Sequence, residues 1–437
     1  MTLNTILLAF GPPLLAPAAV SPSAQDVLAI QVGRAETVSH GALEHAVILI
    51  EGGKIVTIGE DLPIERGIPV LDRDPEWTAL PGLVNCYSRV GMDSRGSSDS
   101  KPMQLASGEL YPGHPDYAEL LAAGVTTLGL YAPGNGIPGQ TVVVRPHGDA
   151  KEAMILRDNA YLKILMRANA ATKKMIRDGF QKADKHLEKE KKAREKWEKD
   201  KEKWEKDQKK KKDDEKKEEK KEEKKNEGEA AGGDEKEEPK EFPAFEAPEP
   251  DDEAKAFLAL RAGELSALAS ISSAAEYLHY VDAIGKEEFR WDLRLPVTRE
   301  SDLFYLAREI GVLGRRIVME PTLSLHPNTM RQRNLPAELQ RAGAKLVLIP
   351  RDDSVRGHED WLRNTGEIVA TGLAREAALR ALTLEPAELL GLGQRLGSLD
   401  KGKDANIIFL NGDPFEPGTR VEAVMLDGRI VSGEVDQ

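Results

Sequence analysis

The sequence predicts an α/β fold, because short apolar segments alternate with helical segments through the middle of the chain. Residues 117–124 have the pattern of a helix that ends at a glycine, and the apolar segment 125–130 follows at once as a strand. Residues 316–320 and 345–350 have the pattern of further buried strands. This repetition is typical of a parallel sheet covered by helices.

Both ends of the chain instead have the pattern of short antiparallel strands. Residues 47–50 and 55–59 are apolar segments joined by Glu-Gly-Gly-Lys, which predicts a β-hairpin. Near the other end, residues 407–410 form an apolar strand candidate, and residues 421–428 follow with a second one. We therefore expect β segments on both sides of the α/β part.

The segment 80–91 carries a resemblance to a known family. It reads Leu-Pro-Gly-Leu-Val-Asn-Cys-Tyr-Ser-Arg-Val-Gly and resembles the first barrel strand of the amidohydrolase superfamily. Residues 117–130 and 136–140 resemble segments of its imidazolonepropionase-like members, and residues 396–428 resemble its C-terminal part. The resemblance implies a TIM-type (β/α)8 barrel plus a small β-sandwich built from both chain ends.

This reading divides the chain into successive parts. Residues 1–24 form an apolar leader with the pattern of a signal peptide, which favours a periplasmic or secreted protein over a cytoplasmic one. Residues 25–79 and 396–437 supply the two parts of the sandwich. Residues 80–395 form the barrel, which a charged segment, residues 185–253, interrupts.

The charged segment begins with an almost uninterrupted run of Lys, Glu, Asp and Arg. Residues 185–225 contain 20 basic and 15 acidic side chains, so opposite charges nearly balance and favour a solvated helix. Leu187, Trp197 and Trp204 are too few for a sustained coiled coil. Residues 226–253 are acidic and rich in Gly, Pro and Ala, which predicts disorder. We interpret the segment as an exposed insertion, with a partner-binding arm as the alternative.

The resemblance implies a specific chemistry for the barrel. Family members hydrolyse carbon–nitrogen bonds other than peptide bonds, using zinc or another divalent metal to activate water. Two histidines after the first strand hold the metal, with a lysine or glutamate after the fourth and histidines after the fifth and sixth. An aspartate after the eighth strand acts as ligand and proton shuttle.

The first strand does not carry these ligands here. Tyr87 and Arg89 occupy the positions of the two histidines. Side chains two residues apart on a strand point to the same side, which is why two histidines can grip one ion. A neutral phenol is a poor ligand, and a guanidinium is a permanent cation without a lone pair. The same face has therefore changed from metal-binding to metal-excluding.

The other ligand positions are also altered. Residues 269–272, at the expected fifth strand, contain no histidine, and residues 295–300, at the expected sixth, contain none either. Lys163 falls near the fourth strand, although we interpret it as a surface lysine. Asp352 and Asp353 follow the expected eighth strand; Asp353 is the candidate catalytic aspartate, and Asp352 a candidate pocket residue, with loop capping as the alternative role.

The spacing of the histidines does not indicate an alternative metal-binding site. No two have the one-residue or i,i+4 spacing of a local metal site, so we interpret them as ordinary surface or core residues. The eight are His40, His45, His114, His147, His186, His279, His326 and His358. We therefore expect no bound metal cofactor.

Composition excludes several other classes of protein. The net charge of −13 argues against a general nucleic-acid binder. The single cysteine, Cys86, rules out a disulfide framework and reads as a buried structural thiol. No later segment reaches the roughly 18 apolar residues of a membrane span.

The sequence thus predicts an amidohydrolase-like pseudoenzyme whose metal centre is dismantled. Tyr87, Arg89 and Asp352 are expected to line the remaining pocket, which is open to a small molecule. Two alternatives stay open. One is an active hydrolase with a reduced or rebuilt metal site, and the other is a binding or scaffold protein that uses the barrel pocket.

Overall fold

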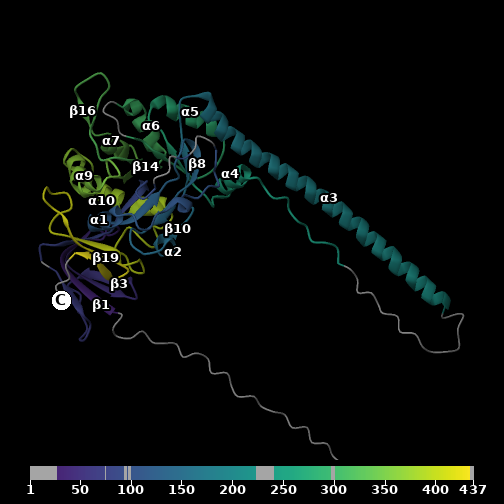
Figure 1. Cartoon of the computed structure of the whole chain (residues 1–437), viewed down its shortest axis with the longest axis horizontal. Coiled ribbons are helices and arrows are strands. Elements are labelled where there is room, and N and C mark those ends of the chain that lie inside the picture. Colours follow the sequence, from purple (N-terminus) through teal and green to yellow (C-terminus); the bar gives the residue numbers. More distant parts are fainter. Residues whose placement is uncertain are drawn as a thin grey trace, which may run out of the picture.

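The structure is a computed structural model of the whole chain. It describes residues 27–73, 75–92, 96, 100–222, 241–296 and 301–433, so the predicted leader, residues 1–24, lies outside the described residues. The architecture is mixed α/β, as predicted. Strands from the two ends of the chain lie side by side at one end of the body, and one long helix projects from the body (Figure 1).

The first sheet joins both chain ends. Its order is β20-β19-β18-β5-β1-β2-β3, with β4 paired to β1. Strand β5 is the link, because it runs parallel to β1 and antiparallel to β18. The strands are β1 (Val27–Glu36), β2 (Ala42–Glu51), β3 (Lys54–Glu60), β4 (Val70–Asp72), β5 (Thr78–Pro81), β18 (Ile407–Leu410), β19 (Val421–Leu426) and β20 (Arg429–Gly433).

The predicted N-terminal hairpin is confirmed. Strands β2 and β3 pair antiparallel across the two-residue turn Gly52-Gly53, whose φ angles are +56° and +77°. Two successive positive φ angles belong to the turn that matches the twist of paired strands, and glycine adopts them without strain. Behind the hairpin, Ile48 and Ile50 are buried together with Phe409 and Met425, so residues from both chain ends share one core.

Two further sheets form the middle of the chain. One has the order β10-β9-β7-β6 and the other β17-β14-β13-β12-β11-β8. Strands β6 and β7 are parallel, as are β11 to β14 and β17, whereas β8, β9 and β10 pair antiparallel. The strands are β6 (Leu83–Ser88), β7 (Val125–Leu130), β8 (Gly136–Gln140), β9 (Val142–Val144), β10 (Ile155–Arg157), β11 (Leu162–Leu165), β12 (Ala267–Ser270), β13 (Trp291–Arg294), β14 (Arg316–Met319) and β17 (Lys345–Leu348).

Helices connect successive parallel strands, which confirms the predicted alternation. The α-helices are α1 (Asp116–Ala122), α2 (Lys151–Met154), α4 (Asp252–Ala262), α5 (Ala274–Ile284), α6 (Ala307–Val312), α7 (Leu335–Arg341), α8 (Val355–Glu359), α9 (Trp361–Ala370), α10 (Arg375–Leu382) and α11 (Leu384–Leu389). Short elements complete the body, namely the 3-10 turns η2 (Ala106–Glu109) and η3 (Asp302–Leu306) and the strands β15 (Ser324–Leu325) and β16 (Gln332–Arg333).

The predicted sixth barrel strand was placed too late in the sequence. The strand is β13, Trp291–Arg294, and it ends before Pro296, which has no N–H group to donate to a sheet. Residues 297–300, which the prediction included, lie outside the described residues. The correction matters because it puts Arg294 at the end of this strand.

The charged segment is a helix that begins earlier than predicted. Helix α3 (Ala170–Glu222) has 53 residues, which at 1.5 Å per residue is about 80 Å, and most of it projects away from the body (Figure 1). Its first turns belong to the core, since Ile176, Phe180 and Ala183 are buried. No helix of the described part of the chain is both long and apolar enough to cross a membrane.

The prediction of disorder over residues 226–253 is wrong for its second part. Residues 223–240 lie outside the described residues, but residues 241–251 run back along α3 (Figure 1). Phe242 contacts Trp197 and Trp204 with ring centroids 5.7 Å apart in each case, and the Trp197 indole N–H donates to the Pro243 carbonyl at 2.9 Å. The aromatic side chains supply the apolar contact that composition alone did not suggest.

Candidate functional site

Polar and aromatic side chains meet where the parallel strands end. Tyr87 is the residue before the last of β6, Tyr131 follows β7, and Lys163 lies in β11. Arg294 is the last residue of β13, and Asp353 comes shortly after β17. The carboxyl ends of parallel strands face one edge of a fold, and active sites of such folds lie there. We call these five residues, together with Arg89, the strand-end cluster.

The centre of the cluster is a pair of tyrosines with a lysine beside them. The rings of Tyr87 and Tyr131 stack with centroids 4.0 Å apart. The Lys163 ammonium nitrogen lies 3.9 Å from the centroid of Tyr131 and 5.9 Å from that of Tyr87. A cation over an aromatic face is attracted by the ring quadrupole, so the two tyrosines hold the lysine in place.

Lys163 is a buried residue, and its interpretation as a surface lysine was wrong. Only 4% of its surface is exposed. Burial, assisted by the neighbouring Arg89 guanidinium, lowers the pKa of Lys163 to about 7. Among the described residues, the Lys163 amine has no carboxylate partner and no hydrogen bond; its contacts are with the two rings.

Tyr87 remains a neutral phenol in this environment. Burial raises its pKa, and the opposing effects of the Arg294 guanidinium and of hydrogen bonds with Ser270 and Tyr131 only partly offset that rise. A neutral phenol is a poor ligand for a metal ion. Tyr87 thus presents a neutral phenol at a position where the resemblance implies a histidine.

A second cation stands at the end of β13. The Arg294 guanidinium lies 5.3 Å from the Tyr87 ring centroid and forms an ion pair with Glu320, which follows β14. Both side chains are largely buried, with 7% and 16% of their surfaces exposed. The position where the resemblance implies a histidine is thus filled by a paired arginine.

Asp353 is tied to the end of β6. The backbone N–H of Arg89 donates to the Asp353 carboxylate at 2.9 Å, and Ser88 also hydrogen-bonds to it. Burial raises the pKa of Asp353, and these hydrogen bonds oppose the rise. The Arg89 guanidinium donates to the Met92 carbonyl at 3.2 Å.

Asp352 does not join the cluster, although it was predicted to line the pocket. It is exposed and accepts hydrogen bonds from the backbone N–H and the hydroxyl of Ser354, the N-cap residue of α8. These bonds lower the pKa of Asp352. The loop-capping alternative describes it better.

One histidine has a more defined role than the sequence indicated. His358 is buried, its Nδ1 lies 2.8 Å from the Ser354 carbonyl, and its Nε2 lies 3.1 Å from the Asn85 amide nitrogen. In the tautomer that satisfies both contacts, Nδ1–H donates and Nε2 accepts. Burial lowers the pKa of His358, so the neutral ring links β6 to α8.

The residues of the cluster do not fit a divalent metal ion. Within the described part of the chain, no three His, Cys, Asp or Glu side chains are grouped so that they could hold one. The strand ends present Arg89 and Arg294, whose guanidinium groups have no lone pair to offer a metal, and Lys163 is the one residue whose type the resemblance implies at its strand. The donor set therefore departs from the one that the family resemblance implies.

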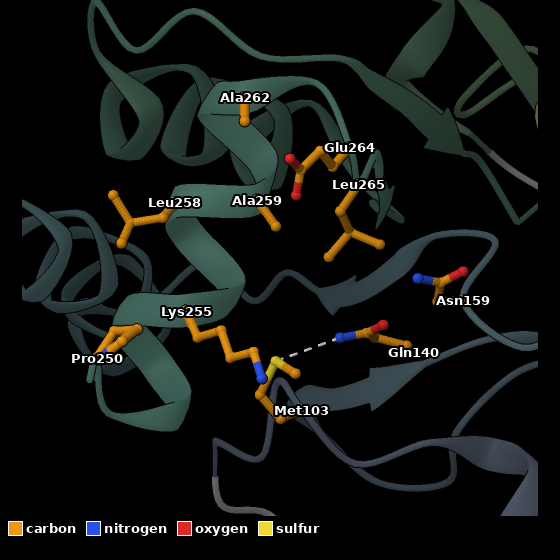
Figure 2. Close-up of a pocket in the computed structure, with 10 residues that line it drawn as sticks. All are labelled: Met103, Gln140, Asn159, Pro250, Lys255, Leu258, Ala259, Ala262, Glu264 and Leu265. Atoms are coloured by element: carbon orange, nitrogen blue, oxygen red, sulfur yellow. Dashed lines mark hydrogen bonds between the residues drawn. The ribbon is translucent and has the colours of Figure 1, made fainter. Parts of the chain in front are cut away.

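A cavity of about 410 Å³ lies elsewhere, beside α4 (Figure 2). Asn159 and Leu265 in its wall precede β11 and β12, so it sits near the amino ends of these strands, away from the cluster. Its lining combines apolar side chains with three exposed polar ones, Asn159, Lys255 and Glu264, and with the buried Gln140, whose amide nitrogen lies 3.6 Å from the Met103 sulfur (Figure 2). Nothing in this lining brings reactive groups together.

Sequence comparison matches the last part of the chain. The family model described as "Amidohydrolase family" matches residues 361–432. The chain is 44% identical over 57 residues to "Amidohydrolase tasK" of Hapsidospora irregularis, and 42% identical over 62 residues to an N-acetylglucosamine-6-phosphate deacetylase of Bos taurus. These matches cover 13% and 14% of this chain, but only 6% and 14% of the length of the two relatives.

Comparison of structures covers far more of the chain. The structure of an amidohydrolase from Thermotoga maritima MSB8 aligns with this chain at a TM-score of 0.70 and 20% identity. The alignment covers 93% of this chain and 100% of the Thermotoga chain. A second amidohydrolase aligns with 94% of this chain over its whole length, at a TM-score of 0.50 and 15% identity. At these identities the likeness concerns the fold, and the chemistry has to be argued from the strand-end cluster.

Proposed function

Since this chain is a member of the amidohydrolase superfamily, we propose that it is a barrel protein that has lost the metal-dependent hydrolytic centre. Its mouth is retained as a pocket for a small molecule. The ancestral reaction, by membership, is hydrolysis of carbon–nitrogen bonds other than peptide bonds.

The proposed barrel consists of the two middle sheets closed into one ring. Helix α11 contacts both β6 and β17, the end strands of the two sheets. The hydrogen bond between the Arg89 N–H and Asp353 also joins the carboxyl ends of these two strands. Both observations support β17 and β6 as neighbours, which makes them the last and first strands of a (β/α)8 barrel.

The observation that carries the functional proposal is the set of residues at two strand ends: Tyr87 and Arg89 stand where the resemblance implies histidines after β6, and the paired Arg294 closes β13. In a metal-dependent member the centre of the strand ends holds a divalent cation. Here an ammonium group stands beside Tyr87 and Tyr131, and the paired Arg294 stands beside Tyr87. Protein side chains thus already supply positive charge at the place where family chemistry needs a metal.

The remaining residues do not replace the lost chemistry. Hydrolysis without a metal needs a base that activates water or a nucleophile with such a base beside it. Asp353, the candidate catalytic residue, accepts hydrogen bonds from Ser88 and from the Arg89 N–H. These contacts favour a role in holding the end of β17 against β6, and we propose that Asp353 acts as a positioning residue.

Metal analysis of the purified chain tests this proposal directly. After dialysis against a mild chelator and incubation with excess zinc or manganese, we expect the chain to retain substoichiometric metal and to hydrolyse no member of a panel of cyclic amides and N-acetylated amines. An active amidohydrolase treated in parallel is the control.

A double variant, Tyr87→His with Arg89→His, sharpens the test. We expect it to remain without metal, because Lys163 and Arg294 stay in place. Near-stoichiometric metal in the wild type, or hydrolysis that depends on added metal, would restore the reading as an active hydrolase.

A further inference from the structure

The cavity beside α4 is lined by a buried amide whose donor is paired and whose acceptor is not. Gln140, the last residue of β8, is 4% exposed and faces this cavity (Figure 2). Its amide nitrogen lies 2.9 Å from the Pro102 carbonyl oxygen and 3.6 Å from the Met103 sulfur. Only the NH2 group can donate to a carbonyl oxygen, so these contacts fix the orientation of the amide.

The amide oxygen of Gln140 accepts no hydrogen bond from the part of the chain that the structure describes. A buried carbonyl oxygen is unfavourable unless a donor reaches it. Because the NH2 group is held by the Pro102 carbonyl, the side chain cannot turn to another partner without breaking that hydrogen bond. The donor that satisfies this oxygen therefore has to enter the cavity.

Two opposite charges line the same cavity. Lys255 lies in the first turn of α4, and Glu264 follows the end of this helix. Figure 2 shows Lys255 extending towards the end of the cavity that Met103 and Gln140 form, with Glu264 at the other end. Neither charged side chain forms an ion pair or a hydrogen bond with a described residue. An anion would pair with Lys255 but face Glu264, and a cation would do the reverse, so a ligand that carries both charges is the better match.

The wall between these charges is apolar. Leu258 and Ala259 line it from α4, and Leu265, which is 3% exposed, lines it from the segment after the helix. The cavity volume of about 410 Å³ lies near the lower end of the range of about 300–1,000 Å³ for ligand pockets. A small ligand with its two charges close together and one apolar branch fits this lining.

We propose that this cavity binds a zwitterionic α-amino acid with an apolar side chain. The ammonium group of the ligand donates to the amide oxygen of Gln140 and to the Glu264 carboxylate. Its carboxylate pairs with the Lys255 ammonium, and its side chain packs on Leu265. The cavity lies near the amino ends of β11 and β12, so the inference goes beyond the proposed function and does not depend on whether the barrel mouth holds a metal.

Titration calorimetry of the full chain at pH 7 with leucine and three matched compounds tests the inference. 4-Methylpentanoate lacks the ammonium group of leucine, and 3-methylbutylamine lacks its carboxylate. 6-Aminohexanoate is an isomer of leucine that keeps both charges but has no apolar branch. We expect leucine to bind at least about tenfold more tightly than each of these compounds, a ratio that corresponds to about 1.4 kcal/mol.

Three variants locate the site. Gln140→Leu removes the buried acceptor and should weaken leucine binding at least about tenfold. Lys255→Met and Glu264→Gln each remove one charge at an exposed position and should weaken it at least about threefold. Lys345→Met and Glu416→Gln are the matched controls, because both residues are exposed and lie outside the lining, and they should leave the affinity within about twofold. If Gln140→Leu does not fold, the two charge variants decide.

The outcomes separate this inference from the proposed function. Absence of leucine binding, or equal binding of leucine and either single-charge compound, would overturn the inference. Equal or tighter binding of 6-aminohexanoate would also overturn it, because the ligand would then make no use of the apolar wall. So would leucine binding that all three variants leave unchanged, because the ligand would then lie elsewhere. Metal content measured on the same sample reports on the proposed function alone.

Discussion

Replacing Lys163 by methionine tests whether burial lowers the pKa of this amine in the folded chain. Methionine keeps much of the length and the apolar stem and removes the group that titrates. Because burial lowers the pKa of Lys163 to about 7 in the folded chain, this lysine stabilises the fold less at neutral pH than at alkaline pH. The variant lacks that dependence.

The sign and size follow from proton linkage. An unfolded lysine has a pKa of about 10.4, so between pH 7 and that value the unfolded chain binds more protons at this site than the folded chain does. Stability therefore rises with pH through this window. Integrated from pH 7 to pH 9, the contribution of Lys163 to the free energy of unfolding increases by about 2 kcal/mol.

Urea titrations at pH 7 and pH 9 give the change in the free energy of unfolding between the two pH values, for the wild type and for Lys163→Met. The difference between the two changes is the contribution of Lys163. Groups common to both chains cancel, and Lys345→Met, at an exposed lysine on β17, serves as the control with no such slope. Between pH 7 and pH 9, we expect the free energy of unfolding of the wild type to rise by about 2 kcal/mol more than that of Lys163→Met. Parallel pH profiles would refute the reasoning, because they would mean that Lys163 titrates alike in both states.

Four further predictions concern other parts of the molecule, three of them changes to the sequence and one a reactivity measurement. Arg294→Met should lower the free energy of unfolding by roughly 3 kcal/mol in urea titrations, because a largely buried carboxylate loses its ion-pair partner; a loss below about 1 kcal/mol contradicts this. His358→Gln should lessen the loss of stability between pH 7 and pH 5, since burial lowers the pKa of His358 and the unfolded chain binds that proton more tightly; an unchanged slope contradicts it. Cys86 should stay unreactive towards a thiol-specific disulfide reagent at pH 8 until urea unfolds the chain, because burial raises its pKa to about 12; reaction in the native state would show an open path to it. Replacing residues 188–249 by a short Gly/Ser linker should leave the Tm within a few degrees, since the turns of α3 buried in the body and the N-cap of α4 remain; collapse of folding would show that the arm supports the body.

Fold prediction succeeded where local patterns and packing agree. The helix and strand at residues 116–130 are bounded by Gly124, whose φ of +88° ends the helix, and the strand is buried along its whole length. The prediction failed at β13, Trp291–Arg294, where apolar and charged side chains alternate. The apolar segment that was predicted as the strand instead contains Pro296. It also failed at residues 241–251, because Phe242 and Phe245 contact Trp197, which lies far earlier in the sequence, on α3.

The site was harder to predict than the fold, since its six members come from five separate strands. Tyr87, Arg89 and Asp353 were found because each sits at a motif position. Tyr131 was missed although it directly follows a predicted strand, and that position alone is the signal that would have found it. The burial of Lys163 was misjudged because a lysine in a short strand gives no local sign of whether rings from two other strands cover it.

The replacements at the strand ends depend on one another, which explains why they form a set. With histidines at positions 87 and 89 alone, a divalent ion would stand near the Lys163 ammonium and the Arg294 guanidinium. At about 5 Å and an effective dielectric constant of about 20, each such contact repels by roughly 6–7 kcal/mol, which is comparable to the binding energy of a micromolar ligand. Conversely, in the arrangement present here the Arg294 guanidinium pairs with Glu320, and hydrogen bonds from Ser88 and the Arg89 N–H hold Asp353 at the end of β6. Under our proposal that the metal centre is lost, the paired arginine and the hydrogen-bonded aspartate therefore form a self-consistent alternative to the metal site rather than a damaged version of it.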